Sequence, residues 1–398
     1  MKGTDTFMSQ HDTSRLRKAW IIWFIVVGIC VVRGALQPTK SNCFPCYQQG
    51  GQNWAQGNDL YAAVADTCRY SPIVHAGFAP FSMLPNSVAA TVWRLFESVL
   101  LLGALAYWMR VFVPFDDRER SRVLLLTIPL MMGNLNAGQS NAIMMAGLLC
   151  GIAALRQERF CLAAIAFAVA CALKIYPLAL VGLFVIVQPR HLGPRFLIAA
   201  IGLMLLPFLL KDPEYVARQY GRWVDNLVDD DRSNWPLVNG FRDTWMLLRM
   251  TGLPINFTAY RIFTLMAGVA MACLVFVHRG QGDRMLEQVF ALGCCWMTVF
   301  GPATEGHTYI LLVPSLALLT VQAMRGDVPA WMNKWIYFAI GSFMIMIMIQ
   351  ATPLIHVPAF LVSMPLGTLA TLRVLVPLMA QPAEQPELLR MEAQCAHS

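Results

Sequence analysis

Charged residues are scarce in this sequence, and the scarcity limits the classes of protein it can encode. Asp, Glu, Lys and Arg make up only 13% of the 398 residues, whereas about a quarter of a soluble globular protein is charged. Hydrophobic residues make up 57%, and the mean hydropathy is +0.53. This composition argues against a soluble enzyme, a disordered chain and a nucleic-acid-binding protein. Long apolar runs instead indicate an integral membrane protein.

The sequence also lacks a dense cysteine framework and an evident internal repeat. Most of its 11 cysteines lie in apolar runs, where cysteine behaves as a small hydrophobic residue. Cys43 and Cys46 form a Cys-x-x-Cys pair outside any redox-protein context, and Cys68 and His75 are poorly spaced for zinc. We expect a structural disulfide among Cys43, Cys46 and Cys68, with free thiols as the alternative. No inverted repeat, which would favour a transporter, is evident.

Apolar runs of membrane-crossing length recur along the chain. A helix needs about 20 residues to cross a bilayer. The first run is not followed by a small-x-small cleavage site, so we interpret it as a span that stays attached. The sequence therefore predicts one all-α membrane domain over residues 1–398, with about twelve spans, near residues 19–36, 88–113, 121–134, 140–156, 159–173, 175–189, 195–210, 259–278, 286–302, 307–323, 333–351 and 357–380.

Basic residues alternate between successive loops as the positive-inside rule requires. If Arg15, Arg17 and Lys18 are cytoplasmic, each short cytoplasmic loop carries at least two basic residues. The alternate short loops at 134–140, 303–306 and 352–356 carry none. This alternation predicts that both termini are cytoplasmic, and we expect the chain to lie in a bacterial inner membrane.

Two long segments, at about 37–87 and 211–258, fall on the predicted outer side. Both are rich in aromatic residues, which is typical of amphipathic helices at the membrane interface. Ionisable and polar residues are costly at membrane depth unless they are paired or wet. Their gathering on one side predicts an outward-facing wet cavity with a functional site, lined by residues from the set Asn58, Asp59, Asp66, Arg69, His75, Asn134, Asn136, Gln139, Asn141, Lys174, Glu305 and His307.

Each of these residues also has a purely structural interpretation. Asp59 can cap a helix, and Lys174 can extend its ammonium group to the interface. Glu305 can favour a helix N-terminus through the helix dipole, and His307 can be a satisfied histidine at the start of a helix. Arg69 can anchor its own loop. The Asn and Gln side chains near residue 139 can satisfy backbone groups in a tight hairpin.

Several short motifs follow one another in a distinctive order. They read Gly57-Asn58-Asp59-Leu60-Tyr61, Arg69-Tyr70-Ser71-Pro72, Leu84-Pro85, Asn136-Ala137-Gly138-Gln139-Ser140-Asn141, Ala172-Leu173-Lys174-Ile175-Tyr176-Pro177 and Gly301-Pro302-Ala303-Thr304-Glu305-Gly306-His307. This order resembles glycosyltransferase family 87, the polyprenol-phosphate-mannose-dependent α-mannosyltransferase-like membrane proteins of the GT-C class. The resemblance covers about residues 20–315. Residues 316–398 are expected to form C-terminal helices and carry no motif of the family.

The resemblance implies a GT-C fold and a membrane glycosyltransferase. Such an enzyme would transfer a hexose, mannose-like, from a polyprenyl-phosphate sugar to a glycolipid or glycan acceptor on the outer face. A single inverting displacement needs a base for the acceptor hydroxyl and cations for the departing phosphate. The lipid-linked sugar is a substrate, and no cofactor is expected. We interpret Asp229-Asp230-Asp231 as solvated loop charge, and metal dependence stays open.

The resemblance also assigns roles, with one departure from the family pattern. The family usually places its catalytic Asp about four residues before a Tyr in the first outer segment. Aligned on Tyr47, that position holds Cys43, so the family base is not carried over. We expect Asp59 to be the base, with Glu305 as the next candidate. His307 matches the family's late His and is expected to orient or share the proton.

The remaining roles concern the donor. Lys174 and Arg69 are expected to bind its phosphate, and Gln139, Asn141 and Tyr70 to bind the sugar or line the cavity. Two other functions fit the same sequence: a lipid or solute transporter or flippase, and an inactive scaffold of the same fold. A transporter should carry charges or helix breaks in the middle of its spans, whereas here the charges lie at their outer ends. The missing Asp is the best argument for the scaffold.

Overall fold

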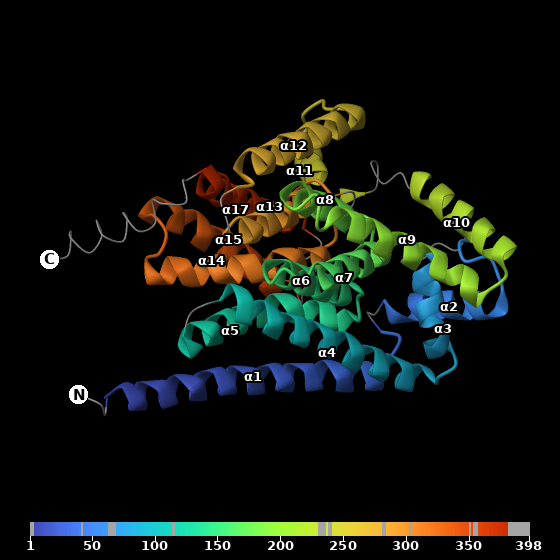
Figure 1. Ribbon diagram of the computed structural model, residues 1–398, viewed down its shortest axis with the longest axis horizontal. Coiled ribbons are helices and arrows are strands. Elements are labelled where there is room, and N and C mark those ends of the chain that lie inside the picture. Colours follow the sequence, from blue (N-terminus) through green and yellow to red (C-terminus); the bar gives the residue numbers. More distant parts are fainter. Residues whose placement is uncertain are drawn as a thin grey trace.

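The computed structural model describes residues 4–40, 43–62, 69–113, 116–229, 236–237, 241–280, 284–301, 304–349, 352 and 357–380. Within these ranges the chain is helical and contains no β-strand. The all-α prediction is thus confirmed for the described part of the chain. Figure 1 shows most of the long helices running side by side.

Each of the twelve expected spans coincides with helical chain. The helices are α1 Thr4–Leu36, α4 Asn86–Phe112, α5 Asp117–Ala137, α6 Asn141–Arg156, α7 Phe160–Leu173, α8 Pro177–Val187, α9 Gly193–Leu210, α12 Phe257–His278, α13 Arg284–Val299, the 3₁₀ turn η2 Gly306–Leu312 continued by α14 Val313–Arg325, α15 Ala330–Ile349 and α17 Ser363–Ala380. In the described part of the chain, seven of these spans are long and apolar enough to cross a membrane, whereas α6, α7, α8 and α13 are apolar but shorter, and α5 falls in neither group. The chain is a multi-pass membrane protein.

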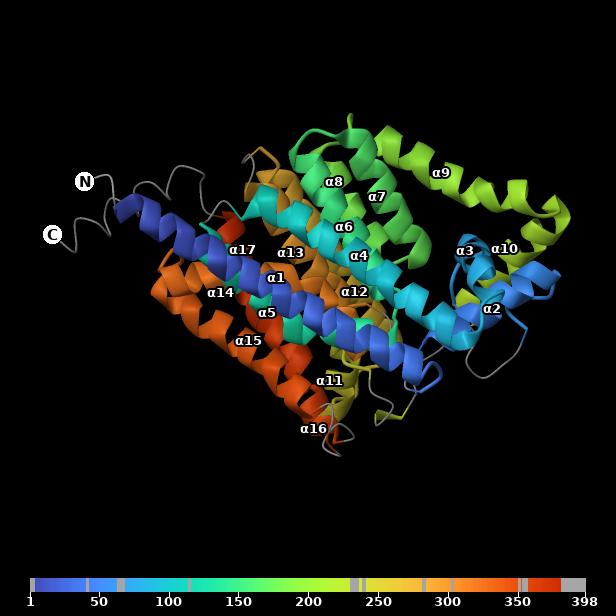
Figure 2. The same cartoon turned by 90° about the horizontal axis from the view of Figure 1, so that it is seen from below.

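Burial separates a central group of helices from a peripheral one. In the span that runs from η2 through α14, 83% of the most apolar stretch is buried inside the protein. The corresponding share is only 17% for α12 and 6% for α9. Figure 2 shows α9 at the margin of the bundle. In a membrane protein such apolar, unburied helices face lipid, so α9 and α12 form part of the lipid-exposed surface.

Four helices lie outside the spans in the two long segments. The first segment forms α2 Phe44–Gln56 and α3 Pro72–Ser82, and the second forms α10 Pro213–Val228 and α11 Thr244–Thr251; a further short helix, α16 Pro358–Leu361, precedes α17. α2, α3 and α10 gather at one end of the bundle, whereas α1 begins and α17 ends at the opposite end (Figure 1). The start of α1 and the end of α17 therefore lie at the same end of the bundle, opposite α2, α3 and α10.

The helices α2, α3 and α4 pack closely through aromatic and small residues. A Cβ atom at Gly51 would lie 2.4 Å from the backbone oxygen of Phe78, so only glycine lets α2 approach α3 this closely. Tyr47 stacks on Phe78 with ring centroids 4.8 Å apart, and Phe78 meets Trp93 of α4 at 4.6 Å. These contacts fix the first outer segment on the end of the bundle.

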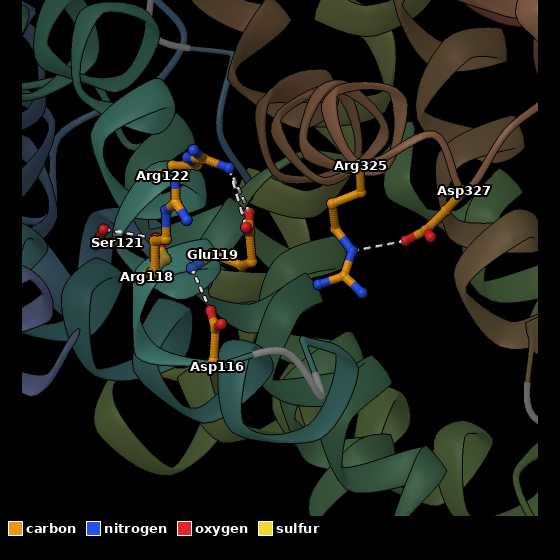
Figure 3. Close-up of polar contacts among 7 residues, drawn as sticks. All are labelled: Asp116, Arg118, Glu119, Ser121, Arg122, Arg325 and Asp327. Atoms are coloured by element: carbon orange, nitrogen blue, oxygen red, sulfur yellow. Dashed lines mark hydrogen bonds and ion pairs between the residues drawn. The ribbon is translucent and has the colours of Figure 1, made fainter. Parts of the chain in front are cut away.

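Charged residues at the opposite end are paired locally. Arg122 donates to Glu119 at 2.9 Å and Arg325 lies 2.8 Å from Asp327, and Figure 3 shows both pairs. The carboxylate of Asp116 caps α5 by accepting from the backbone N–H of Glu119 at 2.9 Å. The start of α5 and the end of α14 are both predicted to be cytoplasmic, and Figure 3 shows their charged residues in one region of the structure.

The cysteine prediction is confirmed in part. Cys46 is disulfide-bonded, whereas Cys43 is free. Cys68 and Asp66 lie outside the described residues. A disulfide at Cys46 fits the oxidising outer compartment that the topology predicts for this segment.

Candidate active site

Three breaks between helices bring the motif residues to one place: between α5 and α6, between α7 and α8, and between α13 and η2. Gly138 ends α5 in the left-handed region, with φ 62°, and its N–H bonds to the carbonyls of Asn134 and Leu135. Glycine adopts this conformation at little cost, and the sharp end leaves Gln139 at the tip of the α5–α6 hairpin. Pro177 occupies the first position of α8, where its missing N–H costs nothing. Lys174 consequently lies in the extended break that follows α7.

Side-chain hydrogen bonds join two of these breaks. Gln139 donates from Nε2 to Oε2 of Glu305 at 3.3 Å, and Asn141 donates to Oε1 of Gln139 at 2.7 Å. Asn134 donates from Nδ2 to the backbone carbonyl of His307 at 2.8 Å. Gln139 and Asn141 are buried, whereas Glu305 is exposed. The two buried amides thus form a chain that holds an accessible carboxylate.

Lys174 provides a cation to this cluster. Burial disfavours its charged form, but the electrostatic influence of Tyr70, Tyr176 and Glu305 outweighs that effect, so the pKa of Lys174 is raised. Its ammonium group lies 6.0 Å from the ring centroid of Tyr176. Lys174 therefore stays protonated over the physiological range, as a phosphate-binding residue must.

A hydroxyl chain joins the first outer segment to the α5–α6 hairpin. The hydroxyl of Tyr70 lies 3.0 Å from that of Tyr47 and 2.9 Å from Oγ of Ser140. The backbone N–H of Ser140 donates to the Tyr47 hydroxyl at 3.1 Å. Tyr70, predicted to bind substrate, is thus fixed beside Gln139, and its electrostatic influence reaches Lys174.

Cys43 lies in the same cluster. The side chain of Gln139 hydrogen-bonds its thiol, and the charges of Glu305 and Lys174 act on it. Burial is the main influence and raises the pKa of Cys43 above its usual range, so the thiol stays neutral. This is the position where the family pattern expects the catalytic Asp. In this chain the position is part of the site but carries no charge, and Glu305 provides a carboxylate nearby.

Two residues of α4 donate hydrogen bonds to backbone carbonyls of the α5–α6 hairpin. Trp93 donates from Nε1 to the carbonyl of Gly138 at 3.0 Å, and Arg94 donates to the carbonyl of Asn136 at 3.1 Å. Both side chains are buried. They satisfy carbonyl groups that the end of α5 would otherwise leave unpaired within the membrane, where such groups are costly. Sequence reasoning missed them, although an Arg inside an apolar helix is a recognisable signal.

Asp59 lies in a different environment from Glu305. One of its carboxylate oxygens accepts from the backbone N–H of Tyr61 at 3.0 Å. The other lies 3.6 Å from Nε of Arg222 on α10, and both side chains are substantially exposed. These contacts connect the first outer segment to α10 and are structural, but Asp59 caps no helix, since none begins directly after it in the described chain.

Arg69 and His307 have different surroundings. The backbone carbonyl of Arg69 accepts from Trp223 at 3.2 Å, and Arg69 directly precedes Tyr70 in the chain. His307 is half-buried in the electrostatic field of Glu305, Arg242 and Lys174. Of the predicted site residues, the structure therefore brings together Glu305, His307, Lys174, Gln139, Asn141 and Tyr70. It leaves Asp59 in its own group.

Arg242 and Asp243, from the second outer segment, also reach the site and were not predicted. Arg242 packs so closely on Gly306 that a Cβ atom there would overlap its guanidinium group. The backbone N–H of Arg242 donates to the carbonyl of Thr304 at 2.7 Å. Asp243 accepts from the backbone N–H groups of Met246 at 2.9 Å and Thr304 at 3.4 Å. The only signal in the sequence was a charged pair inside an aromatic-rich segment.

The site carries no evident metal centre. Among the described residues there is no group of three or more His, Cys, Asp and Glu side chains arranged to hold a metal ion. Of the acidic run at 229–231, only Asp229 belongs to the described part of the chain, and it ends α10. The dominant features are one accessible carboxylate, two nearby cations and several hydrogen-bonding amides and hydroxyls.

Fold and site together define a multi-pass membrane protein with a polar, charged cluster at one end of its helical bundle. The sequence model of glycosyltransferase family 87 matches residues 69–302, more than half of the chain, and the protein belongs to this family. The match includes Lys174, Gln139, Asn141 and the Arg69–Tyr70 pair. No curated protein matches the sequence.

One solved structure is similar to this chain. It is the crystal structure of ArnT from Cupriavidus metallidurans bound to undecaprenyl phosphate. The two sequences are 15% identical, and the match covers 90% of this chain and 76% of that chain with a TM-score of 0.39.

Proposed function

We propose that this glycosyltransferase transfers a hexose, mannose-like, from a polyprenyl-phosphate sugar to a glycolipid or glycan acceptor at the outer face of the membrane. Membership of glycosyltransferase family 87 supports transfer of a sugar. The observation that carries the donor class is the grouping of Lys174 and Arg242 with Glu305 at one end of an apolar bundle. A phosphate attached to a long lipid needs cations at the membrane boundary, and Lys174 and Arg242 provide them beside Glu305.

The reaction follows from the groups in the cluster. The oxygen of an acceptor hydroxyl attacks the anomeric carbon of the donor, and the bond from that carbon to the phosphate oxygen breaks. The lipid phosphate leaves with the bonding electron pair and gains a negative charge, which Lys174 and Arg242 stabilise. The acceptor proton passes to a carboxylate acting as general base. The attack inverts the anomeric configuration because the nucleophile enters opposite to the leaving group.

We assign the general base to Glu305 in preference to Asp59. Glu305 is exposed, held by Gln139 and close enough to Lys174 to influence it. Asp59 instead uses both carboxylate oxygens for contacts with Tyr61 and Arg222. His307 lies in the field of Glu305 and is proposed to orient the acceptor or share its proton. Arg69, Gln139, Asn141 and Tyr70 are proposed to bind the donor.

A transfer assay tests the proposal. Membranes containing the protein are supplied with polyprenyl-phosphate mannose and an outer-leaflet lipid extract, and labelled products are measured. We expect transfer by the wild type and loss in Lys174→Met. Absence of transfer from several polyprenyl-phosphate sugars would contradict the donor class. If Lys174→Met matched the wild type, the proposed phosphate site would be wrong.

The other two functions make different predictions. A flippase or transporter would move solute or lipid in proteoliposomes without any acceptor. An inactive scaffold would transfer no sugar, and Lys174→Met would change nothing in the transfer assay. The charges of the cluster lie at breaks between helices rather than in the middle of spans in both halves of the chain, which is unlike the usual transporter pattern. The exposed Glu305 beside Lys174 is a functional arrangement that a scaffold does not need.

A further inference from the structure

A second candidate binding site lies between α1 and α4, away from the polar cluster. A groove of about 630 Å³ runs between these two helices, and its lining includes Trp20, Phe24, Val99, Leu102, Arg110 and Arg120. Its surface is largely apolar, with arginines at one end. A volume of this size falls within the usual range of small-molecule sites.

The groove is long. Its residues on α4 extend from Leu95 to Arg110, which at 1.5 Å per residue corresponds to roughly 22 Å. Half of the hydrocarbon core of a bilayer is about 15 Å thick. The groove is therefore long enough to reach through one leaflet. A helix about 10 Å wide and equally long would occupy roughly 1,800 Å³, so the groove suits a lipid chain rather than a helix.

The walls of the groove are accessible from the membrane. Phe24 on α1 is 62% exposed and Val99 on α4 is 69% exposed, whereas Leu102 and Val27 between the helices are buried. The exposed walls and buried floor form a channel that opens sideways into lipid. Because the groove lies on the bilayer-facing side of α1 and α4, an occupant can enter directly from the leaflet.

The charged end of the groove determines the kind of lipid it fits. Arg110 is exposed and has no ion-pair partner among the described residues. Arg120 is more constrained: its Nε donates to the carbonyl of Val113 at 3.1 Å, and its NH1 lies 3.6 Å from Asp117. Arg17 and Lys18, both exposed, lie on α1 near the same end. This end is therefore basic and lies on the side that the loop charges predict to be cytoplasmic.

From these observations we propose that the groove between α1 and α4 binds an anionic phospholipid of the cytoplasmic leaflet. Its phosphate contacts Arg110, with Arg120 beside it, and one acyl chain lies along Phe24 and Val99. Trp20 lines the same end of the groove, where interfacial aromatic residues meet lipid headgroups. Basic sites at helix ends on this side of a membrane favour anionic headgroups. The proposal does not depend on the proposed glycosyl transfer, because the polar cluster lies at the opposite end of α4.

The experiment measures lipid binding to the purified, delipidated protein in detergent by native mass spectrometry. Phosphatidylglycerol and phosphatidylcholine with identical acyl chains are titrated in parallel. We expect the wild type to bind phosphatidylglycerol at least about tenfold more tightly than phosphatidylcholine. Arg110→Gln should remove this preference, and Val99→Trp should weaken binding of both lipids by filling the channel.

Matched controls keep the result specific. Leu265→Trp changes an apolar residue on α12 that is similarly exposed, at 68%, and Arg195→Gln removes an exposed charge on α9 at the same predicted side. Both should bind like the wild type, and all four variants should keep the wild-type Tm in the lipid-free state. Equal binding of the two lipids by the wild type would overturn the proposal. So would an unchanged preference in Arg110→Gln, or tighter binding of polyprenyl phosphate than of phosphatidylglycerol at this groove.

Discussion

The surroundings of Asp59 and Glu305 differ, although the two carboxylates have the same charge and lie on the same predicted side of the membrane. Asp59 bonds to the backbone of Tyr61 and pairs with Arg222. Glu305 receives a side-chain hydrogen bond from Gln139 and influences Lys174. The first carboxylate stabilises a junction between α2 and α10. The second is exposed beside the buried amide of Gln139, where we propose that substrate binds.

This difference is the reason that we assign the general base by its proximity to Lys174 rather than by a local sequence motif. A base in glycosyl transfer must take a proton next to the bond that breaks, so it must share a site with the groups that hold the phosphate. The sequence around Asp59 resembles a helix cap, but the structure places Asp59 directly before a turn, where it accepts from the N–H of Tyr61 and pairs with Arg222. Glu305 precedes a 3₁₀ turn, yet its side chain reaches the α5–α6 hairpin. The following predictions test this contrast, beginning with the largest effect.

Glu305→Gln should cause the greatest loss of activity. A positioned general base typically contributes a factor of about 10²–10⁴, so the rate of transfer from polyprenyl-phosphate sugar should fall by about that factor. The isosteric change retains hydrogen bonding to Gln139. Initial rates in membranes at saturating donor measure the effect.

The matched control is Asp59→Asn, which should lower the rate less than about threefold because its contacts are structural. If Asp59→Asn abolished transfer while Glu305→Gln remained active, the assignment of the base would have to be reversed.

Lys174→Met should lower kcat/KM by about 10²–10³, the loss typical of removing one group that stabilises transition-state charge. Lys174→Arg should recover part of that loss because it retains the positive charge. Steady-state kinetics with varied donor measure both variants. A neutral Met variant that kept wild-type kcat/KM would exclude Lys174 from the phosphate site.

Cys43→Asp in the Glu305→Gln background should raise the transfer rate roughly tenfold above that of Glu305→Gln alone. The Cys43 side chain hydrogen-bonds Gln139 and lies in the field of Lys174, so a carboxylate there would lie next to the same cations. Cys43→Asn in the same background is the control and should restore nothing. Equal rates in the two double variants would show that position 43 cannot place a base at the reacting atoms.

His75 should make the Asp59 side of the molecule sensitive to acid. It is buried against Tyr61, and burial lowers the pKa of His75 to about 4 from 6.5. The unfolded chain therefore binds a proton that the folded chain does not between these values, so stability is complete above pH 6.5 and falls as the pH decreases toward 4. The loss is roughly 3 kcal/mol at most.

The measurement is Tm against pH in detergent for the wild type and His75→Gln. The wild type should lose more Tm between pH 6.5 and 4.5 than the variant. Parallel curves would show that the pKa of His75 is the same in the folded and unfolded chain.

The ion pair between Asp59 and Arg222 should have the smallest effect. Both side chains are partly exposed, and exposed pairs contribute about 0.2–1 kcal/mol. A double-mutant cycle of Asp59→Asn and Arg222→Gln, followed by Tm, measures the coupling. Coupling well above 1 kcal/mol would indicate that this junction is more than a surface contact.

Much of the fold could be predicted from the sequence because membrane spans follow from composition. An apolar stretch of sufficient length must form a helix in lipid, since its backbone groups can bond only to one another. The first span and the break at Lys174 illustrate this, because hydropathy locates α1 and Pro177 locates the start of α8. Helix ends were less predictable: α1 begins at Thr4, well before the apolar run.

The sequence predicted which residues could belong to the candidate site, but not which of them lie together in space. The motifs around Gln139 and Lys174 identified members of the cluster. They did not distinguish Glu305 from Asp59, because that choice depends on contacts between residues more than 100 positions apart. Arg242 was missed for the same reason, since its approach to Gly306 joins two segments that no local pattern connects.

The sequence by itself determined that this protein crosses a membrane many times and places the polar residues of its motifs at breaks between spans or in the two long outer segments. Those properties depend on the solvation of each residue and on the length of each apolar run. Only the tertiary structure decided which carboxylate lies in the cluster with Lys174, because packing brings Gln139 to Glu305 and Arg222 to Asp59. The interaction between charges depends on their separation in space, and separation along the chain does not fix that distance.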